Sequence, residues 1–150
     1  MICHRRVGKT FASLMDLVDS ALRIADSRFA YIAPFRHQAK TVAWDYLKEF
    51  SRPVFSRPPN EAKLHVDLLG GGRITLFGAD NPDALRGPAF DGVVLDEYAD
   101  ISPSLFPAVV RPALADRRGF AVLIGTIKGR NQLWQALRQR GLIRHGTRPS

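Results

Sequence analysis

Cysteine is almost absent from this sequence, and long hydrophobic runs are absent altogether. Cys3 is the only cysteine, so no intrachain disulfide can form, and we interpret it as a small loop residue rather than a catalytic thiol. No apolar run approaches the roughly 20 residues that a transmembrane helix needs. The pattern of a secretory signal, a basic region followed by an apolar stretch, is also missing. These absences argue against a disulfide-stapled scaffold and against a membrane protein.

Acidic residues are scarce relative to basic ones. The chain has 22 Lys and Arg against 14 Asp and Glu, which gives a formal net charge of +8. This balance indicates a polyanionic partner, either phosphate or nucleic acid. Hydrophobic residues make up 45% of the 150 positions, which is ordinary for a globular protein with one core. We therefore expect a single domain.

Helical and extended patterns alternate along the chain. Apolar residues at helical spacing predict helices at 9–25, 36–50, 102–115 and 131–140. Short apolar runs predict buried strands at 29–33, 92–96 and 120–126. Two further runs flank Gly70-Gly71-Gly72 and predict a β-hairpin near 64–77. The alternation is typical of an α/β fold with a mostly parallel sheet flanked by helices.

The helical spacing also predicts which side chains face the core. In the first helix these are Phe11, Leu14, Met15, Val18, Leu22 and Ala25. In the second they are Val42, Tyr46, Leu47 and Phe50. For the third helix, we expect Ser102 as the N-cap and Pro103 as the first helical residue. Pro107 and Pro112 should kink or interrupt that helix.

The opening stretch "MICHRRVGKT" ends like a phosphate-binding loop of pattern GxxxxGK[ST]. In such a loop Gly8 lets the backbone approach phosphate oxygens, Lys9 reaches the β- and γ-phosphates, and the Thr10 hydroxyl ligates Mg²⁺. Backbone N–H groups of the turn point at the anion. Cys3 stands where the pattern has its first glycine, and "GKT" alone is also a common helix start. The loop therefore needs support from elsewhere in the chain.

An acidic pair supplies that support. Asp96 and Glu97 end the apolar run "GVVLDE", and ligands in open α/β sheets sit outside the carboxyl ends of strands. An aspartate there can hold Mg²⁺ through its water shell, and the next acid can orient and deprotonate an attacking water. The alternative is a pair of solvated strand-end charges. The phosphate-loop pattern in the same chain disfavours that alternative.

A third segment, "AVLIGTIKG", is an apolar strand that ends in a hydroxyl and a glycine loop. In motor ATPases this position often carries a residue that senses the γ-phosphate state, and Thr126 is the candidate. A plain strand-to-helix turn punctuated by Gly125 and Gly129 fits the residues equally well.

Taken together, "CHRRVGKT", "GADNPDALRGPAFDGVVLDEYAD" and "IGTIKGRN" resemble the ATPase domain of the large terminase subunit of tailed bacteriophages. The resemblance extends from about residue 2 to residue 140. It implies a P-loop NTPase fold with an additional catalytic strand, with ATP and Mg²⁺ as cofactors. It implies double-stranded DNA as a partner and, in the full-length protein, the small terminase subunit, the portal and a homo-oligomeric ring. Such a phage or prophage protein works in the host bacterial cytoplasm, away from membranes.

Site residues follow from the resemblance by position. It implies that the nucleotide is bound by Arg6, Val7, Gly8, Lys9 and Thr10, and that Mg²⁺ is held by Thr10 and Asp96. Its implied catalytic residues are Glu97 as the base, Arg5 as a loop arginine stabilising γ-phosphate charge, and Thr126 in the segment that couples hydrolysis to DNA movement.

Three positions keep more than one interpretation. Arg6 can equally be a surface charge or a phosphate contact to DNA. Arg86 lies in a segment that the family keeps just before the acidic strand, and its role stays open. Ile127 stands where terminases commonly have proline, which changes the turn of the coupling loop.

The resemblance also implies that residues 1–150 are a partial ATPase domain. The upstream adenine-binding segment and the nuclease domain are absent, and the strand entering the phosphate loop is cut to Met1-Ile2. The strand at 120–125 is then expected beside the acidic strand, with its other side open. The implied function is ATP hydrolysis that drives double-stranded DNA into the viral procapsid. The alternatives are a non-catalytic remnant with weak phosphate or DNA binding, and a helicase-like P-loop ATPase.

Overall fold

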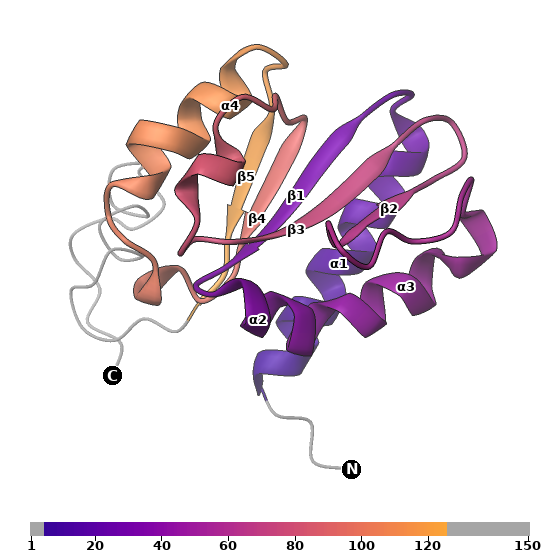
Figure 1. Ribbon diagram of the computed structural model, residues 1–150, viewed down its shortest axis with the longest axis horizontal. Helices are drawn as coiled ribbons and strands as arrows, with labels where there is room; N and C mark the ends of the chain where they lie inside the picture. The colour runs from indigo at the N-terminus through magenta and orange to yellow at the C-terminus, as the bar shows by residue number, and fades with distance from the viewer. Residues whose placement is uncertain (1–4, 126–150) are drawn as a thin grey trace, which may run out of the picture.

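A computed structural model describes residues 5–125, in which one sheet lies between two helical layers (Figure 1). Its strands are β1 (Arg28–Ala33), β2 (His65–Asp67), β3 (Arg73–Gly78), β4 (Gly92–Leu95) and β5 (Phe120–Leu123). They lie in the order β2-β3-β1-β4-β5. β1 pairs in parallel with β3 and β4, and β4 pairs in parallel with β5, while β2 runs antiparallel to β3. The mostly parallel α/β sheet and the hairpin are therefore confirmed.

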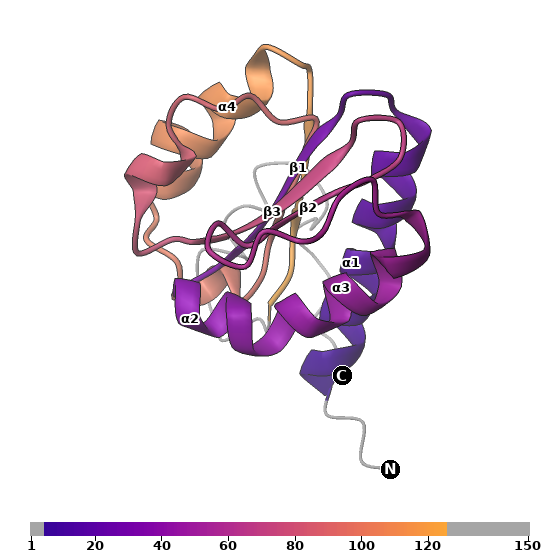
Figure 2. The same ribbon diagram turned by 45° about the vertical axis from the view of Figure 1, so that its right-hand side comes forward.

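Helices cover both faces of the sheet (Figures 1 and 2). One layer consists of α1 (Arg5–Arg23), α2 (Arg36–Ala39) and α3 (Asp45–Ser51), and the other of a π turn (Phe106–Val110) with α4 (Arg111–Ala115). The central strand β1 is buried on both sides, because Phe29 and Tyr31 enter the core under α1 while Ala30 and Ile32 enter the core under α4. None of the described helices is long and apolar enough to cross a bilayer.

Helix α1 buries a different stripe from the one expected. It begins at Arg5, before the expected start at Lys9, and its buried apolar side chains are Leu14, Leu17, Val18 and Ala21. The prediction was wrong for four residues that are exposed: Phe11, Met15, Leu22 and Ala25. Phe11 packs instead against the rings of Tyr46 and Phe50 on α3, with ring centroids 6.1 and 4.4 Å away. An aromatic pair across two helices therefore holds Phe11 outside the core.

The second predicted helix is continuous but contains a π turn, Lys40–Trp44, between α2 and α3. Leu47 is fully buried and Tyr46 and Phe50 are half-buried, as expected. Val42 is 37% exposed, so its inward assignment was wrong, and Ala43 and Trp44 are buried in its place. A π turn has one residue more than an α turn, which shifts the buried stripe along the helix.

The segment at 102–115 is helical only from Leu105 onwards. The Ser102 hydroxyl lies 3.1 Å from the hydroxyl of Ser104 rather than capping a helix N–H group, and Pro103 precedes the helix, so both expectations were wrong. The expected interruption is confirmed, because Pro107 lies within the π turn and Pro112 follows it in α4. Proline lacks an N–H group and crowds the carbonyl four residues earlier, which a wider turn relieves.

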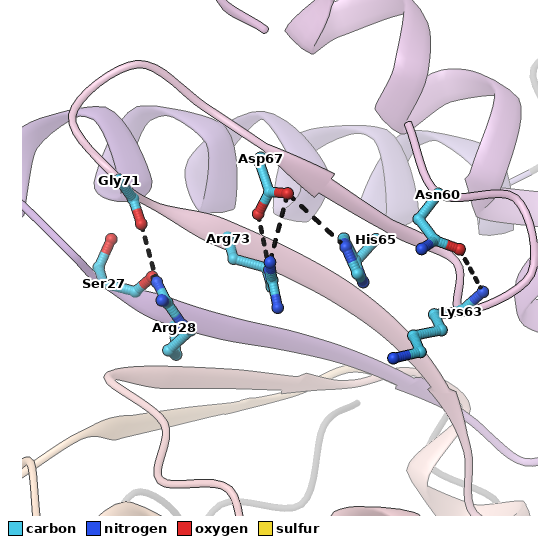
Figure 3. Close-up of polar contacts among 8 residues, drawn as sticks. All are labelled: Ser27, Arg28, Asn60, Lys63, His65, Asp67, Gly71 and Arg73. Atoms are coloured by element: carbon cyan, nitrogen blue, oxygen red, sulfur yellow. Dashed lines mark hydrogen bonds and ion pairs between the residues drawn. The ribbon is translucent and has the colours of Figure 1, made fainter. Parts of the chain in front are cut away.

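Polar contacts tie the hairpin to β1 (Figure 3). Arg28 donates from Nη1 to the Gly71 carbonyl oxygen at 2.8 Å, and Arg73 Nε donates to Asp67 Oδ1 at 2.6 Å. His65 Nε2 lies 3.7 Å from Asp67 Oδ2, and burial, followed by the positive charge of Arg73, lowers the pKa of His65. Arg28 and Arg73 are register partners at the starts of parallel strands. This cluster therefore lies at the opposite end of the sheet from the strands' carboxyl ends.

Strand β5 is an edge strand within the described part of the chain. It pairs with β4 on one side, and Phe120 and Val122 are 45% and 41% exposed. The expected position beside the acidic strand is confirmed, but full burial of this strand was wrong for these two side chains. The helix expected at 131–140 and the residues Met1-Ile2 lie outside the described residues.

Candidate functional site

Thr10 and Asp96 bring the phosphate-loop and acidic motifs into direct contact. Thr10 Oγ1 donates a hydrogen bond of 2.7 Å to Asp96 Oδ2, although 86 residues separate the two in sequence. Thr10 is 3% exposed on α1, and Asp96, 9% exposed, directly follows β4. The Asp96 N–H donates to the Ile32 carbonyl at 2.8 Å. This bond extends the β1–β4 ladder by one residue and fixes the position of the Asp96 backbone. The two residues expected to hold Mg²⁺ are therefore in contact at the carboxyl end of the sheet.

Tyr31 is a member of this site that the sequence analysis did not identify. Its side chain is buried on β1, and its hydroxyl donates to Asp96 Oδ2, the same oxygen that accepts from Thr10. Burial, and then the negative charge of Asp96, raises the pKa of Tyr31 far above its ordinary value, so this hydroxyl acts as a donor. The available signal was that a buried tyrosine hydroxyl normally needs a hydrogen-bond partner.

Glu97 has a left-handed backbone, with φ 49° and ψ 47°. Its N–H donates to Asp96 Oδ1 at 2.8 Å, and its carbonyl accepts from Asp100 N–H at 2.8 Å. Its carboxylate oxygen Oε2 accepts a hydrogen bond of 2.8 Å from Gln38 Nε2 on α2. A left-handed non-glycine residue persists only where its surroundings fix it, and such residues cluster at functional sites. Gln38 carried no signal in the sequence, where it reads as an ordinary polar helix residue.

Gly8 and Lys9 are exposed on the first turns of α1, immediately before Thr10. A Cβ atom added at Gly8 would meet no atom of the described residues within 4 Å outside its own helix, so there is space beside this turn of α1. The backbone of residues 5–8 is helical, and the side chains of Arg5, Arg6 and Val7 lie outside what the structure describes. Thr126 and Ile127 also lie outside it. The roles expected of these five residues stay predictions.

Arg86 follows the short 3₁₀ turn Pro82–Leu85 on the surface. Its Nη1 lies 2.9 Å from Asp83 Oδ1, with both side chains largely exposed. An exposed pair of this kind contributes about 0–1 kcal/mol to stability, so it holds Arg86 only weakly. Arg86 is therefore available to other partners on the surface.

The Thr10 hydroxyl and the Asp96 carboxylate are oxygen ligands of the kind that suits Mg²⁺. Within residues 5–125 no three His, Cys, Asp or Glu side chains gather into a potential metal site. Mg²⁺ commonly binds through one or two protein oxygens together with waters and substrate phosphates. The residues present therefore fit a magnesium–nucleotide complex better than a protein cage around a free ion.

The family model described as terminase large subunit, T4likevirus-type, N-terminal, matches residues 4–119. Among curated proteins, the large terminase subunit of Thermus virus P23-45 is 29% identical, over 87% of this chain and 31% of that protein. The chain therefore spans about a third of the length of this relative.

Among solved structures, the large terminase ATPase domain of Thermus phage P74-26 superposes with a TM-score of 0.74 at 25% identity, covering 87% of this chain and 60% of that one. The large terminase of a thermophilic bacteriophage, in complex with ATP-γ-S, superposes with a TM-score of 0.64 at 16% identity, over 80% of this chain and 30% of that one. The second likeness shows a shared fold.

Proposed function

The chain belongs to the family of terminase large subunits, and from this we propose that it binds and hydrolyses ATP to drive double-stranded DNA into a viral procapsid. The observation that carries the proposal is the contact of Thr10 with Asp96, followed in sequence by Glu97. Two motifs distant in sequence meet at the carboxyl ends of the strands, where ligands of α/β folds bind. The solved relative in complex with ATP-γ-S lends further support to a nucleotide ligand.

In the proposed reaction Glu97 accepts a proton from a water whose oxygen attacks the γ-phosphorus. The bond from the γ-phosphorus to the bridging oxygen breaks, and ADP leaves with its electron pair. Lys9 contacts the β- and γ-phosphates, and Gly8 leaves room for them. Thr10 and Asp96 would hold Mg²⁺, which would neutralise charge on the phosphate oxygens. We propose Arg5 as a further cation near the γ-phosphate and Thr126 as the coupling residue.

Replacing Lys9 with alanine should weaken MgATP binding by about tenfold or more, because charged hydrogen bonds are worth about 1.5–3 kcal/mol. A fluorescent ATP analogue titrated against the parental and variant proteins measures this. Lys63→Ala removes an exposed lysine on the hairpin side of the molecule and should leave the affinity unchanged. Equal affinities for the parental and Lys9→Ala proteins would contradict the phosphate-binding role.

We propose double-stranded DNA, the small terminase subunit, the portal and further copies of the chain in a ring as partners, in the host cytoplasm. The net charge of +8 supports the DNA partner. Each Arg or Lys contact to a phosphate releases counterions, so DNA affinity should fall steeply between low and physiological salt and show no sequence preference. A titration of two unrelated duplexes at several salt concentrations measures both. An affinity that does not change with salt concentration, or that is restricted to one duplex, would count against binding through the DNA phosphates.

A further inference from the structure

We propose that Gln38 is a positioning residue that orients the carboxylate of Glu97 for its work as the base. This inference rests on the proposed function, in which Glu97 deprotonates the attacking water. Its geometric basis is the hydrogen bond of 2.8 Å from Gln38 Nε2 to Glu97 Oε2, between residues 59 positions apart.

The backbone of Glu97 is already fixed by three neighbouring contacts. Its N–H and carbonyl are both bonded, to Asp96 Oδ1 and to the Asp100 N–H. The next residue, Tyr98, donates its N–H to the Ile124 carbonyl at 2.9 Å. The position of the carboxylate then depends on the side-chain torsions of Glu97, which a hydrogen bond to the carboxylate restricts. Gln38 makes such a bond.

Gln38 stands on a rigid base. Helix α2 directly follows the central strand β1, and the neighbouring Ala39 is fully buried in the core beneath it. The Arg36 N–H donates to Asp80 Oδ1 at 3.1 Å, which ties the start of α2 to the end of β3. These contacts fix the position of the Gln38 donor, and the donor in turn fixes the position of the carboxylate. Such precision matters because a misplacement of about 1 Å can lower the rate of catalysis by about 10²-fold.

The chemistry of an amide suits this task. An amide N–H orients a carboxylate through one oxygen without adding a positive charge beside it. A lysine or arginine in the same place would form an ion pair and make the carboxylate a weaker base. In the proposed reaction the oriented carboxylate accepts the proton of the attacking water. Gln38 therefore positions Glu97 without placing a positive charge beside it.

The test is a double-mutant cycle between Gln38→Met, which keeps the side-chain length and removes the donor, and Glu97→Gln. We expect Gln38→Met alone to lower kcat by about 10-fold and to leave the KM for ATP within about twofold. In the Glu97→Gln background the same change should cost nothing further, because its effect acts through Glu97. Lys40→Met, an exposed change two positions along the same helix, should leave kcat unchanged.

The Gln38→Met protein should remain folded. Loss of one hydrogen bond costs about 1 kcal/mol of stability, so its thermal unfolding should shift by only a few degrees. A purely structural contact would change kcat by the same factor whether or not Glu97 is present. An equal loss of kcat in both backgrounds, or a change confined to KM, would overturn the proposal while leaving the ATPase function standing.

A second measurement needs no turnover and keeps the two proposals distinguishable. The side-chain amide of Gln38, labelled with ¹⁵N and assigned by its loss in Gln38→Met, should shift in the spectrum of Glu97→Gln. Lys40→Met should leave it in place. An amide signal that ignores Glu97→Gln would overturn the positioning role even in a protein whose hydrolysis is intact. If the parental protein hydrolyses no ATP while the Gln38 amide signal shifts in Glu97→Gln, the result would instead count against the proposed function.

Discussion

Replacement of Glu97 with glutamine is expected to lower the rate of ATP hydrolysis by about 10²- to 10⁴-fold, the usual contribution of a general base. Glutamine has the size of glutamate, so the left-handed turn after β4 and the contact with Gln38 both remain available. MgATP binding should be unchanged, because the residues proposed to hold the phosphates and Mg²⁺ are Lys9, Thr10 and Asp96. Single-turnover hydrolysis and nucleotide titration on the same samples separate the two properties.

The matched control for this prediction is Glu49→Gln. Glu49 is an exposed glutamate on α3, so the same chemical change there should leave both hydrolysis and binding at the parental level. Parental hydrolysis by the Glu97→Gln protein would remove Glu97 from the role of base. Loss of binding together with hydrolysis would show that the substitution acts on the fold of the turn instead.

Replacement of Asp96 with asparagine should lower MgATP affinity and hydrolysis together, by about 100-fold. The carboxylate accepts three donors, the hydroxyls of Thr10 and Tyr31 on Oδ2 and the N–H of Glu97 on Oδ1. An amide group presents hydrogens on one side, so at least one of these donors loses its acceptor at a cost of about 1–3 kcal/mol. The negative charge that attracts Mg²⁺ is lost as well. Nucleotide titrations at several Mg²⁺ concentrations measure the effect.

Tyr31→Phe is the informative comparison for Asp96→Asn. It removes one of the two hydroxyl donors on Oδ2 while the carboxylate, its charge and the aromatic packing remain. We expect a smaller loss of MgATP affinity, on the order of a single hydrogen bond, or about 1 kcal/mol. A Mg²⁺ dependence in Asp96→Asn that matches the parental protein would contradict the metal-holding role of Asp96.

The strands and the central pairing of the site could be predicted from the sequence, because their signals are local. Short apolar runs identify β1, which is followed by Pro34, and β4, which is followed by Asp96, and the topology of a parallel sheet brings their carboxyl ends together. The contact of Thr10 with Asp96 follows from two motifs whose residue types are fixed by phosphate chemistry.

The parts that could not be predicted depend on tertiary contacts. The buried stripe of α1 differs from the predicted one, and Phe11 packs against two rings on α3, a contact between helices that the spacing within one helix does not predict. Tyr31 and Gln38 reach the acidic pair only through the fold, and each reads in isolation as an ordinary strand or helix residue. The two π turns leave no pattern of their own in the sequence, because one added residue changes the phase of a helix without changing its composition.

The π turn between α2 and α3 makes this stretch sensitive to length rather than to side-chain chemistry. The residues before it are aligned with Glu97 through Gln38, and the residues after it are aligned with the core through Leu47. Each residue of an α-helix turns the chain by about 100°. Loss of a single residue from Lys40–Trp44 would leave the amino-acid composition almost unchanged, yet it would force one of these two alignments to be abandoned. We therefore expect this stretch to tolerate substitution of its exposed residues better than insertion or deletion of a single residue.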